Sequence, residues 1–496
     1  SKVKVKNATI SPQSGRSRCA LSDLSLLFYL LALWTLLAGC DDRAHRHDDI
    51  VSNSANTDFE ATAGIANGIA PPLGGAVSNS EGSVAGHEHI GGTMGLPDDQ
   101  AEPTQVNFDF PCESIAPESA KMRPGRTQSG KYLAIDGRTL QAPGLSVDLE
   151  GAPGNVVTHP LYPVAYVVSS SRDDRRIYVV DLDEGEIRQD LVPGDSFFGL
   201  ALSPDGRQLY ASSGKRGRID VFSIGVAGQL ASAGSIETGG YPAGLALSDD
   251  GSRLWVGLYD RAEAVEIDTA SGAVRRRIEL SQTAWDVAFI EATNQVLFSD
   301  LSSTGLAVVD ADLGEEHALI EIGLSLADIT IDPLGGRVWV AVSGTSQVAT
   351  LDLLTLDVQR IDPVVPAGPN ADLGNRNVNA LAFDPETQRL YVSRSAENTI
   401  SVLAAEDMRF LGAIPAGGSP TGLALSESGA RLVISEARSR TGPNEGESSK
   451  NVVGGSLSVV NLRGRDLQTD TETAARHYRN PVLAFPFECT GFFPIP

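Results

Sequence analysis

Several features that would reveal a chemistry are missing from this chain of 496 residues. It holds only four cysteines, and none forms a C-x-x-C or C-x-x-C-H motif, which excludes covalent attachment of a c-type haem. The G-x-S-x-G, H-E-x-x-H, P-loop and dinucleotide-binding patterns are also missing, so no common motif points to an activity. Aromatic residues make up only 6%, whereas 51 residues are glycine, a composition that suits a β-architecture with many turns.

Basic residues are scarce: 39 Lys and Arg stand against 63 Asp and Glu, for a formal net charge of −24. This balance argues against nucleic-acid binding, which depends on neutralising phosphates, and against a polybasic contact with a membrane. Removal of residues 1–39, which hold five basic residues and one acidic residue, would leave a net charge of −28. The simplest consequence of such a surface is solubility through self-repulsion.

The apolar run Leu24–Leu37 has 14 residues, short of the roughly 20 that an ordinary transmembrane helix needs. It follows a basic start and ends in Leu37-Ala38-Gly39-Cys40, an order typical of an export signal. The sequence before Cys40 resembles a bacterial lipobox, whose cysteine is lipidated and becomes the first residue of the mature chain. The resemblance implies an extracytoplasmic, lipid-anchored protein of the bacterial cell envelope. By the same analogy, Asp41 and Asp42 imply the periplasmic face of the inner membrane if the source is Gram-negative. An ordinary signal peptide with a chance cysteine is the alternative.

Two cysteines, Cys112 and Cys489, remain if Cys19 leaves with the leader and Cys40 carries the lipid. In an oxidising compartment we expect them to form a disulfide. Residues 40–105 are rich in Ser, Asn, Gly, Ala and Asp, which predicts a lipidated cysteine followed by a disordered tether. Two H-x-H pairs in this segment could bind a metal weakly, but solvated low-complexity sequence explains them more simply. We therefore predict no metal site there.

A pattern of about 42 residues recurs seven times between residues 155 and 470. Each copy has a short apolar strand, an S/D-P-x-G-type turn, a second apolar strand, a polar gap and a third strand; the fourth strand varies most. In Gly199–Gly206 (GLALSPDG), proline presets φ of the turn and the last glycine accepts a positive φ. A single sheet of this kind cannot cover both of its faces. The period therefore predicts an all-β fold, a seven-bladed β-propeller with four-stranded blades. The copies begin near Asn155, Gly199, Gly244, Asp286, Asp328, Ala380 and Gly422.

Residues 391–402, with the sequence YVSRSAENTISV, resemble the Tyr-Val-Thr-Asn…Asn-Thr-Val-Ser-Val signature of YVTN-repeat seven-bladed propellers. The resemblance implies the fold but no particular chemistry, because related repeats serve surface-layer proteins, lactonases and cofactor-carrying oxidoreductases. Arg394 stands where the family usually has asparagine, which places a cation at the end of a second strand.

The two ends of the repeat region are expected to close the ring. The last copy has three clear strands followed by a polar stretch, 463–472, so we expect Ser146–Leu149 to supply its outer strand. The predicted parts are a signal peptide (1–39), a tether (40–105), an N-terminal extension with the closing strand (106–154), the propeller (155–470) and a C-terminal tail (471–496). The phenylalanine-rich tail is expected to pack on the side or bottom of the ring, or alternatively to bind a partner.

Loops that join successive blades and loops between second and third strands lie on one face of a propeller, which we name the top face. The two longest insertions, 362–377 and 438–455, belong to these two classes. Loops on a rigid scaffold commonly carry function, although ordinary surface insertions are the alternative. The candidate ligand- or partner-binding residues are Asn370, Asp372, Asn375, Arg376, Arg394, Arg438, Arg440, Asn444, Glu445 and Lys450.

Further top-face candidates precede or begin inner strands. Tyr241 and Trp285 join the binding candidates, and Phe198 and Asn379 share the same setting. Asp286 and Asp328 occupy equivalent positions in neighbouring copies and are the candidate catalytic residues. Paired carboxylates could hold a divalent cation or act as acid and base. The resemblance offers a structural alternative, which we favour: aspartate at this position bonds to backbone amides and ties blades together.

The leading hypothesis is a monomeric, membrane-tethered propeller that binds an envelope protein or a glycan through its top face. It predicts no cofactor and no membrane contact beyond the lipid anchor. One alternative is a lactonase-like hydrolase that uses the top-face carboxylates. Another is a propeller that holds a non-covalent redox cofactor.

Overall fold

The computed structural model describes residues 125–126, 132–133, 139–140, 142–170, 175–193, 195–365, 377–426, 429–440 and 454–479. For residues 125–126, 132–133, 139, 438–440 and 476–479 it describes the backbone alone. The predicted signal peptide, the tether, Cys40, Cys112, Cys489 and the phenylalanine-rich tail lie outside these residues.

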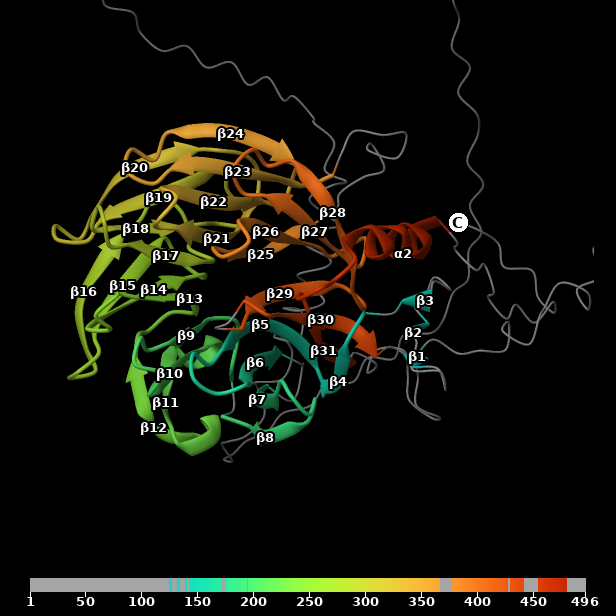
Figure 1. Ribbon diagram of the computed structural model, residues 1–496. Helices are drawn as coiled ribbons and strands as arrows, with labels where there is room; N and C mark the ends of the chain where they lie inside the picture. Colours follow the sequence, from blue (N-terminus) through green and yellow to red (C-terminus); the bar gives the residue numbers. More distant parts are fainter. Residues whose placement is uncertain are drawn as a thin grey trace, which may run out of the picture. The chain divides into compact units, whose positions relative to one another are not determined.

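Seven antiparallel four-stranded sheets form the blades of a β-propeller, which confirms the predicted fold (Figure 1). From the inner to the outer strand, blade 1 holds β5 (Ala152–Thr158), β6 (Val164–Ser170), β7 (Arg176–Asp181) and β8 (Ile187–Leu191). Blade 2 holds β9 (Leu200–Leu202), β10 (Gln208–Ser213), β11 (Arg218–Ile224) and β12 (Leu230–Glu237). Blade 3 holds β13 (Pro242–Leu247), β14 (Arg253–Leu258), β15 (Glu263–Asp268) and β16 (Ala273–Glu279). Blade 4 holds β17 (Val287–Ile290), β18 (Gln295–Phe298), β19 (Gly305–Asp310) and β20 (Glu315–Glu321).

Blade 5 holds β21 (Leu326–Asp332), β22 (Arg337–Val342), β23 (Gln347–Asp352) and β24 (Val358–Pro363). Blade 6 holds β25 (Val378–Asp384), β26 (Arg389–Arg394), β27 (Thr399–Ala404) and β28 (Phe410–Pro415). Blade 7 holds β29 (Pro420–Leu425), β30 (Arg431–Arg440), β31 (Gly454–Asn461) and, from the other end of the repeat region, β4 (Leu145–Glu150). Three two-residue strands, β1 (Gly125–Arg126), β2 (Tyr132–Leu133) and β3 (Thr139–Leu140), form a separate small sheet.

The ring closes as the sequence predicts. Inner strands contact one another in blade order, and β29 of blade 7 contacts β5 of blade 1. Strand β4 pairs with β31, with Leu149 opposite Gly455 and Leu145 opposite Val459. Leu149 is fully buried in an apolar cluster shared by blades 7 and 1. The closing strand therefore completes a sheet and also seals the joint between the first and last blades.

The turns after the inner strands of blades 2, 3 and 7 depend on a left-handed backbone. Gly206, Gly251 and Gly429 adopt φ of 68°, 71° and 60° at the predicted glycine position. At Gly206 an added Cβ would also approach the buried His159 ring, at 3.1 Å from Nε2. Nε2 of His159 donates to the Gly206 carbonyl over 2.9 Å, and Nδ1 accepts the Leu161 amide over 3.0 Å. His159 is therefore a structural residue that holds this turn in place.

Substitution of Gly206 by alanine tests two effects, the strain of a positive φ and the close approach of an added Cβ to His159. We expect Gly206→Ala to lower the free energy of unfolding by more than Gly336→Ala, because Gly336 has φ of 69° with no atom within 4 Å of an added Cβ. The Gly336 variant should lose about 1–2 kcal/mol from backbone strain alone. If urea unfolding shows that the two variants lose the same free energy of unfolding, the contact with His159 does not contribute to the loss.

The sequence did not predict helix α2 (Leu467–Arg479), which occupies much of the polar stretch after blade 7. The helix packs on β28, where the Thr471 hydroxyl accepts the Ala413 amide over 2.8 Å. The Asp466 carboxylate accepts the Gln468 amide over 3.1 Å at the start of the helix, and contact with blade 6 adds tertiary support. No helix in the described part of the chain is long and apolar enough to cross a membrane.

Candidate functional site

Both long insertions belong to the predicted classes of loop: one joins β24 to β25 and the other joins β30 to β31. Strand β30 extends to Arg440, so the backbones of Arg438 and Arg440 lie at a strand end rather than in the loop. Arg394 ends β26; it is nearly buried and forms an ion pair with Glu397. The remaining insertion candidates, Asn370, Asp372, Asn375, Arg376, Asn444, Glu445 and Lys450, lie outside the described residues, and their role stays a prediction.

Five aromatic rings gather on the top face of blades 2 to 4, and we call them the aromatic cluster: Phe197, Phe198, Tyr241, Tyr259 and Trp285. Phe197 lies at its centre, with ring centroids 4.6 Å from Tyr241, 5.9 Å from Trp285 and 6.4 Å from Tyr259. Phe198 packs on Trp285 at 4.3 Å. All five side chains are half-buried, so each keeps part of its surface open to solvent.

The cluster comes from four separate top-face connections. Phe197 and Phe198 precede β9, Tyr241 precedes β13, Tyr259 follows β14 and Trp285 stands before β17. The residue that precedes the inner strand, Tyr241 in blade 3, is Ser325 in blade 5 and Ser419 in blade 7. The sequence had indicated Phe198, Tyr241 and Trp285 as top-face residues. It missed Phe197 and Tyr259, which an aligned comparison of the top-face loops could have revealed.

Charged groups border the aromatic cluster. The Tyr241 amide donates to the Asp260 carboxylate over 2.8 Å, and Asp260 pairs with Arg261 at 2.9 Å. Both side chains of this pair are exposed. Asp260 therefore fixes the backbone at Tyr241 and presents a charged pair beside apolar rings, an arrangement suited to a ligand with both apolar and polar groups.

Asp286 and Asp328 behave as the favoured structural alternative predicts. Asp286 accepts the amide of Ile329 in the next blade over 3.0 Å, and Asp328 accepts the amide of Leu381 in the blade after that over 2.6 Å. Burial raises the pKa of Asp286 to about 6. Burial, and then the negative charge of Asp286, raise the pKa of Asp328 well above its ordinary value. The pair ties three blades together, and burial beside a second carboxyl favours the protonated form of each member above the ordinary pKa range of aspartate.

This pair makes stability fall as pH rises. A carboxyl with a raised pKa binds more protons in the folded than in the unfolded state between its ordinary value, 3.8, and about 6. Asp328→Asn keeps an acceptor for the Leu381 amide and removes one charge. We expect it to gain on the order of 1–3 kcal/mol over the wild type at pH 7.5 and to lose this gain at pH 4, measured by urea unfolding.

Asp352→Asn is the matched control with the opposite sign. Amides of Thr355 and Leu354 lower the pKa of Asp352, so its contribution to stability is present above the ordinary pKa and is lost as the pH falls through the lowered one. The control should therefore be less stable than the wild type at pH 7.5. A gain for Asp328→Asn that is equal at both pH values would contradict the assigned proton sharing.

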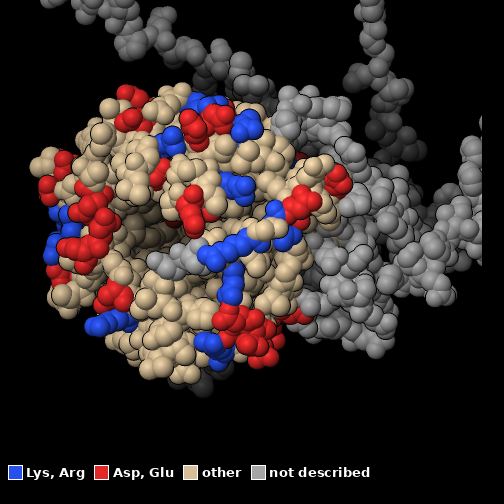
Figure 2. Space-filling model, viewed as in Figure 1, with Lys and Arg blue, Asp and Glu red and all other residues tan. Residues whose placement is uncertain are grey.

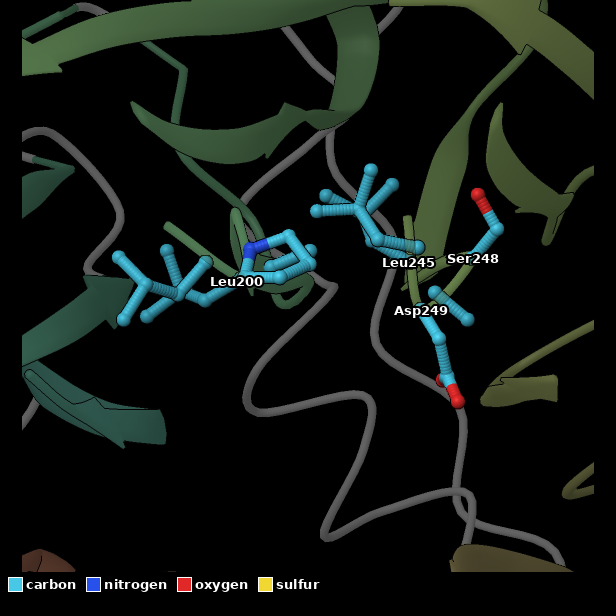
Figure 3. Close-up of a pocket in the computed structure, with 9 residues that line it drawn as sticks. Leu200, Leu245, Ser248 and Asp249 are labelled. Atoms are coloured by element: carbon cyan, nitrogen blue, oxygen red, sulfur yellow. The ribbon is translucent and has the colours of Figure 1, made fainter. Parts of the chain in front are cut away.

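A cavity of about 570 Å³ lies beside inner strands β9 and β13. Figure 3 shows Leu200 on one side of it and Leu245, Ser248 and Asp249 on the other. Leu202, Leu247 and Pro204 also line it, and its walls expose both polar and apolar surface. Among the residues that the structure describes, no group of three or more His, Cys, Asp or Glu side chains is placed to hold a metal ion.

Comparison with known proteins supports the fold. The family model described as "Lactonase, 7-bladed beta-propeller" matches residues 175–287, which span the aromatic cluster and Asp286 but not Asp328. No curated protein matches the chain. A solved structure, Kuenenia stuttgartiensis hydrazine synthase, superposes with a TM-score of 0.51 at 16% identity, over 64% of this chain and 97% of that chain. Such a likeness shows the architecture alone. The protein is a seven-bladed β-propeller that is similar to this family model over residues 175–287.

Proposed function

We propose that this protein is a binding module that holds its ligand or partner on the top face, at the aromatic cluster. The observation that supports this function most strongly is the gathering of five half-buried rings on connections between strands. The cores of the blades are already filled by aliphatic residues and by fully buried aromatics such as Trp255 and Trp339. Aromatic rings with partial exposure beside a polar rim are typical of recognition surfaces.

Truncation of Trp285 tests this function. We expect Trp285→Ala to reduce capture of the partner from cell-envelope extracts by at least tenfold, because loss of a central aromatic anchor typically costs 2 kcal/mol or more of binding. The measurement is affinity capture with the intact protein followed by mass spectrometry. Phe289→Ala is the matched control, since Phe289 lies in the same blade but packs on Trp255 away from the cluster. Equal loss of capture in both variants would assign the effect to stability and contradict the proposal.

The insertions 362–377 and 438–455 belong to the same face and are proposed to extend the binding surface. Their deletion should remove binding with little change in the melting temperature. The proposed location is the cell envelope. There the chain would be anchored by a lipid on Cys40 and cross-linked by a disulfide between Cys112 and Cys489. Release of the protein from membranes by Cys40→Ser would support the anchor, and unchanged membrane association would contradict it.

Lactone hydrolysis is a second candidate function, favoured by the partial family match and by the raised pKa of Asp286. A carboxyl that holds its proton near neutral pH can act as a general acid, and its ionised neighbour can act as a base. Asp328→Asn removes one of the two groups, so turnover of simple lactones should be abolished if the pair is catalytic. Unchanged turnover would leave the pair with its structural role alone.

A further inference from the structure

The outer strand of blade 2, β12, differs from the outer strands of the other blades. In blades 1, 3, 4, 5 and 7 these strands carry charged residues within their length, which discourage pairing with another chain. Examples are Arg188 in β8, Arg276 in β16, Glu316 in β20, Arg360 in β24 and Asp148 in β4. In blade 6 the outer strand β28 has no charge, and helix α2 packs on it. Strand β12 is free of charge from Leu230 to Ile236, and among the described residues it pairs with β11 alone.

The middle of β12 is also more exposed to solvent than the corresponding part of β16 and β20. Its five residues Ala231–Ser235 are all exposed, whereas β16 and β20 alternate between exposed and half-buried positions over the corresponding stretch. The five side chains are alanine, serine and glycine, so neither face of the strand presents bulk to an approaching chain. Figure 2 shows charged side chains gathered along the edge of the molecule where β16 and β20 lie, and few where β12 lies.

A bulge between Ser232 and Gly234 does not explain the difference. The outer strands of blades 1 to 6 all show a register shift against their third strand. The bulge is therefore part of the common blade geometry, and the lack of charge and of cover is particular to β12.

We propose that the edge of β12 over Ala231–Ser235 receives an extended, basic segment of a partner polypeptide, which adds a fifth strand to blade 2. An edge strand presents backbone N–H and C=O groups whose complement is the backbone of another strand. The exposed Glu237 at the end of β12 favours a partner with basic residues. Small side chains on β12 let the added strand approach without steric conflict. The proposal does not depend on the function of the aromatic cluster.

Hydrogen exchange of the full chain, read by mass spectrometry over residues 230–237, tests the proposal. The probe is a synthetic peptide of alternating threonine and valine with two lysines at each end. A matched peptide with N-methylated amides keeps the charge and side chains but cannot pair. We expect the first peptide to slow exchange of the β12 amides by about tenfold near nine-tenths occupancy, and the methylated peptide to leave it unchanged. A peptide with glutamates in place of the lysines should bind more weakly.

Two protein variants complete the test. Ser232→Lys with Ser235→Lys places charges on the edge and should abolish the protection, whereas Gln359→Lys on the already charged β24 should preserve it. Unchanged melting temperatures show that both variants fold. The proposal is overturned if millimolar peptide protects nothing, or if both peptides protect equally. Concentration-dependent protection without peptide would assign the edge to a second copy of this chain and would also overturn it.

Discussion

Glu266→Ala is expected to lower the free energy of unfolding by about 3–5 kcal/mol, the cost of removing one partner from a buried ion network. Glu266 is fully buried on β15, and its carboxylate lies 2.8 Å from Arg253 and within ion-pair contact of Arg276. Arg253 and Arg276 both also donate to the carbonyl of Ala311 in blade 4. Without the carboxylate, two cations would be left uncompensated at the joint between blades 3 and 4.

A second glutamate on the same strand, Glu263, supplies the control. Glu263 pairs with Arg277 at 2.5 Å but remains partly exposed, so Glu263→Ala should cost less than about 1 kcal/mol. Denaturant unfolding of the three proteins measures the difference. Glu266→Gln, which keeps hydrogen-bond acceptors without the charge, should fall between them. A similar small loss at Glu263 and Glu266 would show that the network contributes no more than a surface pair.

Leu149→Ala is expected to have a comparable effect at the closure of the ring. Truncation of a fully buried leucine costs about 2–5 kcal/mol, depending on how far the surroundings collapse. Here the cavity would open between the first and last blades, where Leu149 packs with Val156 and Leu457. We therefore expect a lower melting temperature together with faster proteolysis at β4.

Leu145 on the same strand is 41% exposed and provides the control. Leu145→Ala should cost less than about 1 kcal/mol, because little surface is removed from the interior. If the two variants have the same melting temperature, β4 is dispensable to the fold and the ring closes without it.

The fold could be predicted from the sequence because each blade repeats one local pattern. The inner and second strands recur at a similar spacing, four of the seven copies share a glycine turn, and local propensity agrees with the tertiary structure. The closing strand could be predicted by elimination, since the last copy lacked a fourth strand. Helix α2 was not predicted, because it lies outside the repeated pattern and packs on β28, a strand of another blade.

The candidate site was only partly predictable. The equivalent positions of Asp286 and Asp328 could be read from the repeat, as could the loop class of Tyr241 and Trp285. The packing of Phe197 among three rings depends on how three blades converge, and no pattern within one copy contains that information. The ion network around Glu266 likewise joins two blades through backbone carbonyls, which carry no sequence signature.

The pairing of β4 with β31 also imposes a delay during biosynthesis, because the two strands lie far apart in the sequence. Val459 leaves the ribosome more than 300 residues after its partner Leu145. At synthesis rates of about 5–20 residues per second, β4 remains without its partner strand β31 for roughly 15–60 s. During this interval its edge is available to proteases, to chaperones and to other nascent chains. A ribosome that stalls before the last blade releases a chain that cannot complete the ring, so quality control can recognise an unfinished copy by its unpaired beginning.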